Sequence, residues 1–80
     1  MKGRQVTAEQ AFGATLRELR TVTGLSQDAL AFDAGLDRTY ISLLERGLRQ
    51  PTLKTIIVLA GQLGVSPGSL VDATMKRVRS

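Results

Sequence analysis

Residues 24–47 read GLSQDALAFDAGLDRTYISLLERG, and this stretch decides the fold. Ser26 and Asp37 are residue types that favour the position just before a helix, and each precedes apolar residues at helical spacing. Gly35 stands where the first of these helices would end, a place that glycine commonly occupies. Only residues 35–37 separate the two helices, and helices joined by so short a turn cross at a steep angle.

Similar signals predict three further helices around this pair. Thr7, with Gln10 three residues later, forms a capping box for a helix that ends at Gly24. A fourth helix opens at residues 51–52 and a short fifth at residues 66–67, since proline is favoured at the first helical position. No segment alternates with period two over the length of a strand. The fold class is therefore all-α, with five short helices.

Helical spacing also predicts the core. The residues expected to face it are Phe12, Leu16, Leu19 and Val22 or Thr23 in the first helix, Ala29, Leu30 and Ala34 in the second, Ile41 and Leu44 in the third, Leu53, Ile56, Leu59, Ala60 and Leu63 in the fourth, and Leu70 in the fifth.

Eighty residues make one small domain, expected over residues 8–74 between flexible basic termini at 1–7 and 75–80. The apolar fraction of 42% is enough for a core, and 22% charged residues argue against disorder. The longest apolar run, residues 56–60, is too short to span a bilayer, and the basic N-terminus leads into no apolar stretch. These features predict a soluble cytoplasmic protein with no membrane association.

The chain has no histidine and no cysteine, so the commonest general base and the commonest zinc ligands are missing. The carboxylates are scattered, and no two share an obvious site. The composition therefore predicts that the chain is not an enzyme and binds neither a metal nor a cofactor. The sequence also gives no sign of a site for a small-molecule effector.

Positive charge is distributed unevenly over a net charge of +4. Residues 21–37 contain three aspartates and no basic residue, whereas residues 38–54 carry four basic side chains against Glu45. Lys2, Arg4 and residues 76–79 add positive charge at the two ends. This distribution suits a polyanionic partner.

The chain resembles the Cro/XRE-type helix-turn-helix family, the lambda-repressor-like DNA-binding domains. Residues 24–31 (GLSQDALA), 34–36 (AGL) and 39–47 (TYISLLERG) carry the resemblance, and PTL at 51–53 and LGVS at 63–66 continue it. It covers roughly residues 12–72, and the run RTYIS at 38–42 with ERG at 45–47 is most similar to controller proteins of restriction–modification systems. The resemblance implies a compact five-helix domain, whose second and third helices form the helix-turn-helix. It also implies a homodimeric transcriptional regulator on a palindromic operator.

The third helix fits this expectation by its own geometry. At 100° per residue, Arg38, Ser42 and Arg46 lie on one stripe with Thr39 beside it, opposite the apolar stripe. An arginine can bond guanine through two hydrogen bonds in the major groove, and a threonine methyl can contact thymine. The resemblance implies that Arg38, Thr39 and Ser42 occupy base-reading positions, so these are the residues that we expect to contact bases.

Other roles follow from the resemblance and from the positions of the residues along the chain. It implies that Gln27 bonds the phosphate backbone or a nearby base. Tyr40 flanks the core, and its hydroxyl either contacts a phosphate or is hydrated while the ring packs in the ordinary way. The residues expected on the DNA backbone are Gln27, Tyr40, Arg46, Arg49 and Gln50. The resemblance further implies a structural ion pair between Arg20 and Glu45.

Val58 and Gly61 depart from the family pattern, which commonly has polar residues there. A glycine inside a helix costs about 1 kcal/mol relative to alanine, so close approach of another helix would explain it. With Val71, these residues are expected to form a dimer interface.

Three alternatives remain open from the sequence. In these alternatives the chain is a phage repressor, an antitoxin-type regulator, or a protein-interaction module that kept this fold and lost DNA binding. The presence of Gln27, Arg38, Thr39 and Arg46 together argues against the last of these.

Overall fold

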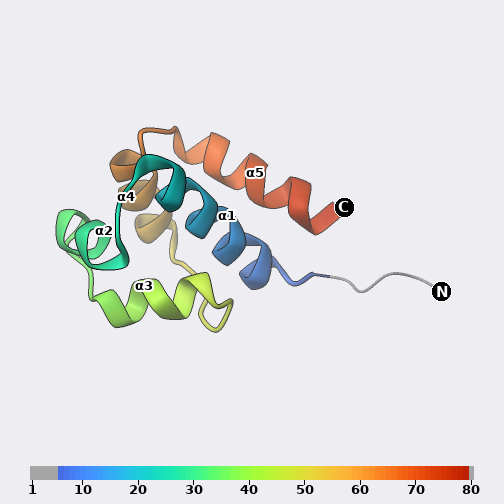
Figure 1. Ribbon diagram of the computed structural model, residues 1–80. Helices are drawn as coiled ribbons and strands as arrows, with labels where there is room; N and C mark the ends of the chain where they lie inside the picture. Colours follow the sequence, from blue (N-terminus) through green and yellow to red (C-terminus); the bar gives the residue numbers. More distant parts are fainter. Residues whose placement is uncertain (1–5, 80) are drawn as a thin grey trace.

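Five helices build the computed structural model, which describes residues 6–79. They are α1 (Ala8–Thr23), α2 (Gln27–Ala34), α3 (Arg38–Glu45), α4 (Leu53–Leu63) and α5 (Pro67–Arg79). No strand occurs among the described residues, so the prediction of an all-α fold with five helices is confirmed. Helix α1 packs against both α3 and α5, and α2 packs against α3 and α4 (Figure 1).

Side-chain caps fix the starts of most helices where the sequence predicts them. The capping box of Thr7 and Gln10 is present at α1, and Ser26, Thr52 and Ser66 each accept a hydrogen bond from a backbone N–H at α2, α4 and α5. Asp37 occupies the cap position of α3, but its side chain makes no cap hydrogen bond.

The core lies where the five helices meet. Its members are Phe12, Leu16, Leu30, Ala31, Ile41, Leu44, Leu59, Ala60, Leu63 and Leu70. Two predicted core positions are wrong. Leu53 is 73% exposed because it begins α4, whose buried residues start only at Thr55. Val22 and Thr23 are exposed as well, because the last turn of α1 extends past its buried residues.

Helix α5 is longer than predicted. It continues to Arg79, so the expectation of a flexible tail over residues 75–80 is wrong for residues 75–79. Arg77 explains the extra turns, because its Nε atom donates to the buried Thr15 hydroxyl of α1 (2.9 Å) and its Nη2 atom contacts Glu18. The predicted flexibility of residues 1–5 and of Ser80 lies outside the described residues.

Candidate nucleic-acid interface

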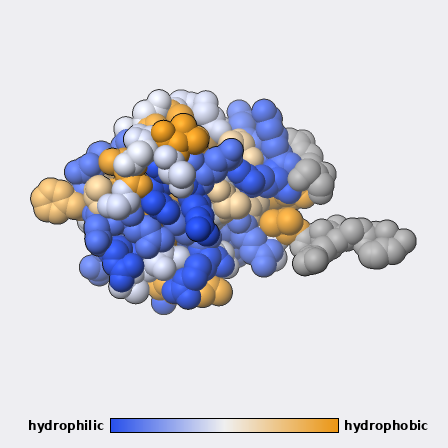
Figure 2. All heavy atoms as spheres, viewed as in Figure 1, coloured by the Kyte–Doolittle hydropathy of each residue, from blue (hydrophilic) through white to orange (hydrophobic). Residues whose placement is uncertain are grey.

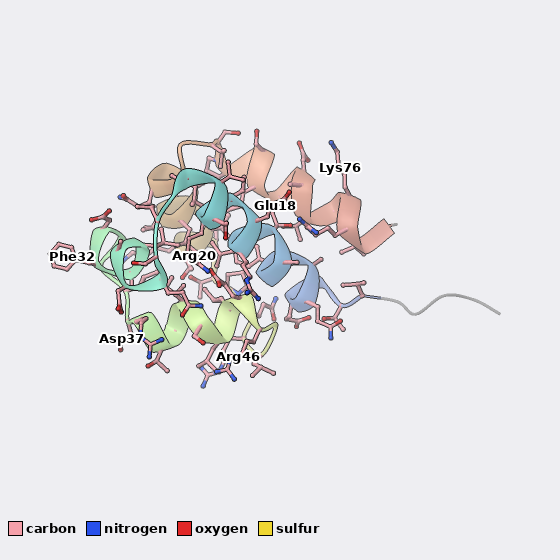
Figure 3. All side chains as sticks on the ribbon, in the orientation of Figure 1. Glu18, Arg20, Phe32, Asp37, Arg46 and Lys76 are labelled. Atoms are coloured by element: carbon pink, nitrogen blue, oxygen red, sulfur yellow. The ribbon has the colours of Figure 1, made fainter. Side chains whose placement is uncertain are left out.

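Helix α3 lies at one edge of the molecule, with one side against α1 and α2 and the other facing outward (Figure 1). Ile41 and Leu44 are fully buried on the inner side. On the outer side, Arg38, Thr39 and Arg46 are exposed, and Ser42 is half-buried. Arg46 points away from the body of the protein (Figure 3), and the surface in the same view is mostly hydrophilic (Figure 2). The polar stripe predicted from the sequence is therefore presented to solvent.

The α2–α3 turn holds this helix in place. Gly35 has a φ of 71°, a left-handed conformation that side chains with a Cβ rarely adopt. Its N–H bonds the Phe32 carbonyl, and the next residue, Leu36, donates to the Ala31 carbonyl at 2.8 Å. These two bonds end α2 and turn the chain directly into α3.

Arg20 and Glu45, for which the resemblance implies a pair, join α1 to the end of α3. Arg20 Nε donates to Glu45 Oε2 at 2.5 Å, and Arg20 Nη2 donates to Glu45 Oε1 at 3.0 Å. Only 3% of the Glu45 side chain is exposed, and hydrogen bonding to Glu45 raises the pKa of Arg20. A third bond, from Arg20 Nη1 to the Leu25 carbonyl at 2.9 Å, ties the same guanidinium to the start of the helix-turn-helix.

We expect Glu45→Gln to lower the free energy of unfolding by about 2 kcal/mol, because it leaves the Arg20 cation without its countercharge. Affinity for DNA, measured well below the melting temperature, should fall much less. Thermal melting and DNA titration of the same sample test this, with exposed Asp72→Asn as the control for loss of a carboxylate. An unchanged melting temperature with lost binding would assign Glu45 to the interface instead.

Gln27 is the first residue of α2 and lies beside this pair. Its Nε2 atom donates to Glu45 Oε1 at 3.0 Å, and its Oε1 atom accepts from Arg38 Nη1 at 3.4 Å. The resemblance implies a contact with DNA for this residue. In the structure Gln27 bridges the ion pair to Arg38.

Asp28 was not predicted to belong to the site. Its Oδ1 atom lies 3.4 Å from Arg38 Nε, and both side chains are exposed, at 81% and 55%. The sequence offers one signal for it, an aspartate in the first turn of α2, and this signal is equally typical of a carboxylate that interacts with the helix dipole.

The remaining residues predicted to contact the phosphate backbone lie in α3 and in the loop that follows it. Tyr40 is half-buried, packs against the core, and has its hydroxyl 3.4 Å from Thr55 Oγ1. Arg49 and Gln50 are exposed in the loop between α3 and α4. Arg49 and Gln50 therefore extend the exposed polar surface past the C-terminal end of α3.

Gly13 positions α3 and was missed by the sequence analysis. A Cβ atom built on it would lie 2.3 Å from the Leu44 carbonyl oxygen and 2.6 Å from that of Glu45. The backbones of α1 and α3 therefore touch here without a side chain between them. An interior glycine in a predicted helix was the available signal.

The predicted dimer residues lie on α4 and α5. Gly61 and Val71 are exposed, and Val58 is half-buried. A Cβ atom at Gly61 would meet nothing within 4 Å in the monomer. Leu53 and Ile57 on α4 and Met75 on α5 are exposed too, and sequence analysis did not assign them to this surface.

An apolar groove of about 210 Å³ runs beside these residues. Its lining comprises Ala8, Glu9, Phe12, Gln50, Pro51, Ile56, Val71, Thr74 and Met75.

Within residues 6–79 no group of three or more acidic side chains could hold a metal ion. No single helix in that range is long and apolar enough to cross a membrane; α4 and α5 reach such length and composition only together, across a bend of 103°.

Comparisons with known proteins agree with this arrangement. A family model described as "Helix-turn-helix" matches residues 16–70. Control protein C.BamHI from Bacillus amyloliquefaciens is 44% identical over 64 residues, which cover 79% of each chain. The restriction–modification controller protein C.AhdI from Aeromonas hydrophila is 50% identical, with a TM-score of 0.75 over 78% of this chain and 94% of that one.

The controller protein C.Esp1396I, solved as a tetramer in complex with its natural 35-base-pair operator, superposes with a TM-score of 0.82 at 28% identity. That match covers 95% of this chain and all of C.Esp1396I. The chain therefore belongs to the Cro/XRE-type helix-turn-helix family of transcriptional regulators.

Proposed function

We propose that this chain is a restriction–modification controller, a non-enzymatic transcriptional regulator that binds a palindromic operator as a homodimer. The observation that carries the proposal is the outward polar face of α3, on a helix-turn-helix held from behind by the Arg20–Glu45 pair. Similarity to C.BamHI and C.AhdI, each over three quarters of the chain or more, supports the controller role. Such a regulator acts on DNA in the cytoplasm and uses no cofactor.

In this proposal α3 enters the major groove. Arg38 bonds a guanine, while Thr39 and Ser42 contact neighbouring base edges. Tyr40, Arg46, Arg49 and Gln50 bond phosphates, and these contacts set position and orientation without distinguishing sequence. Because Gln27 lies in the first turn of α2 beside Arg38, it acts through that arginine in addition to any contact of its own.

The dimer follows from two observations. Val58, Gly61 and Val71, together with the exposed Leu53, Ile57 and Met75, form the α4–α5 surface, which a second copy would cover. A single recognition helix also contacts too few base pairs for useful specificity, so two copies related by a two-fold axis would read two half-sites.

Arg38→Ala should lower affinity for the preferred duplex by about 1–3 kcal/mol and remove discrimination at one base pair per half-site. Arg49→Ala should instead weaken preferred and random duplexes about equally and reduce the salt dependence of binding. The measurement is titration by fluorescence anisotropy at several salt concentrations, on a duplex first selected from a random pool by the wild-type protein. Identical behaviour of the two variants would contradict the division between base and phosphate contacts. Failure to select any duplex would favour the interaction-module alternative.

A further inference from the structure

We propose that Asp28 determines how selectively Arg38 recognises DNA, by holding its guanidinium over the bases and away from the phosphates. This inference rests on the proposed function, because it concerns the same recognition helix. Asp28 would thus be a positioning residue that orients Arg38 for its contact with a base.

The geometry around Arg38 supports this role for Asp28. The guanidinium is approached by two acceptors from the first turn of α2, Gln27 Oε1 at its Nη1 atom and Asp28 Oδ1 at its Nε atom, both at 3.4 Å. Arginine has five N–H donors, so these two contacts leave enough for a two-bond contact with guanine O6 and N7. The two contacts therefore favour one orientation of the guanidinium before DNA binds and leave N–H groups for a contact with a base.

One of these two acceptors, Gln27 Oε1, is fixed from inside the fold. The carboxylate of Glu45 can only accept hydrogen bonds, so Gln27 must present its amide nitrogen to Glu45. That choice turns Gln27 Oε1 outward, toward Arg38. The orientation of Gln27 thus depends on the buried pair. Among the described contacts, Asp28 is the only charged residue of α2 that contacts Arg38.

Electrostatic repulsion also favours this role for Asp28. A free arginine at a DNA surface is attracted by phosphates, and phosphate contacts raise affinity for every sequence alike. A carboxylate beside the guanidinium repels phosphates and leaves the contact with guanine possible. Asp28 should therefore reduce binding to random DNA more than binding to the preferred sequence.

The experiment compares Asp28→Asn with Asp33→Asn. Both remove one negative charge from exposed positions of α2, and only Asp28 contacts Arg38. Each variant is titrated against the selected duplex for one dimer, against duplexes altered at each base pair in turn, and against a random duplex. Circular dichroism and melting verify that both variants are folded.

For Asp28→Asn we expect discrimination at the base pair read by Arg38 to fall roughly tenfold, with other positions unchanged. Binding to random DNA should strengthen several-fold at low salt, more than for Asp33→Asn. In an Arg38→Ala background, Asp28→Asn should cause no further loss of discrimination.

Equal effects of the two aspartate variants would overturn the inference, since Asp28 would then contribute only general charge. A loss that persists without Arg38 would also overturn it, because Asp28 would then contact a base directly. In both cases the wild-type protein still prefers its selected duplex, and the proposed function stands. A wild-type protein without sequence preference would overturn both proposals.

Discussion

Gly13→Ala should destabilise the protein by about 3 kcal/mol and lower its melting temperature by more than 10 °C, roughly. The added Cβ atom would lie 2.3 Å from one backbone oxygen and 2.6 Å from another, and neither can swing aside as a flexible side chain can. The clash therefore outweighs the gain of about 1 kcal/mol that alanine normally brings to a helix interior. For a domain of this size, the expected loss is a large part of its whole stability.

Gly68→Ala is the matched control. Gly68 also lies within a helix at an ordinary φ, and the only atom near its Cβ position is the Ser66 hydroxyl at 3.9 Å. This variant should melt at or slightly above the wild-type temperature, as followed by circular dichroism. If Gly13→Ala melted at the same temperature as Gly68→Ala, α1 and α3 would have to shift apart easily. The close contact at Gly13 would then not position the recognition helix.

Local signals were sufficient to predict where the helices of this fold begin. Thr7, Ser26 and Thr52 bond the backbone of the helix that follows them, and such bonds depend on residues three apart in sequence. The buried stripes of α2 and α3 likewise follow from helical spacing. The positions of Arg38 and Thr39 on the outer face could be predicted for the same reason.

Features that depend on how helices cross could not be predicted in this way. Gly13 allows α1 to meet α3 backbone to backbone, and the α2–α3 angle brings Asp28 close to Arg38. The tail over residues 75–79 was misjudged for a similar reason. Its basic residues suggest solvent, yet Arg77 reaches Thr15 and Glu18 on α1, which is 59–62 residues away in sequence.

The α4–α5 surface was predicted only in part. Val58 and Gly61 stood out as departures from a family pattern, whereas Leu53 was assigned to the core because it shares the period of the buried residues. Periodicity cannot show where a helix extends past the core. The first turn of α4 extends past the core, and the Leu53 side chain is therefore exposed to solvent.

Ile57→Glu should convert the proposed dimer to a folded monomer and weaken operator binding by about 10²–10⁴-fold. Ile57 is exposed in the monomer, so the variant keeps its core, but a second copy covering α4 would have to bury the new carboxylate unpaired. Each half-site would then be bound separately, and the high effective concentration of the second recognition helix would be lost.

Val22→Glu is the control, because it puts the same charge on an exposed aliphatic residue at the end of α1. It should remain dimeric in sedimentation and bind the operator normally. Gly61→Ala adds a finer test on the same face. If a partner helix packs closely at Gly61, alanine should weaken the dimer; in open solvent it should instead raise stability by about 1 kcal/mol. A wild-type protein that sediments as a monomer well above micromolar concentration, even with palindromic DNA, would exclude a dimer on this surface.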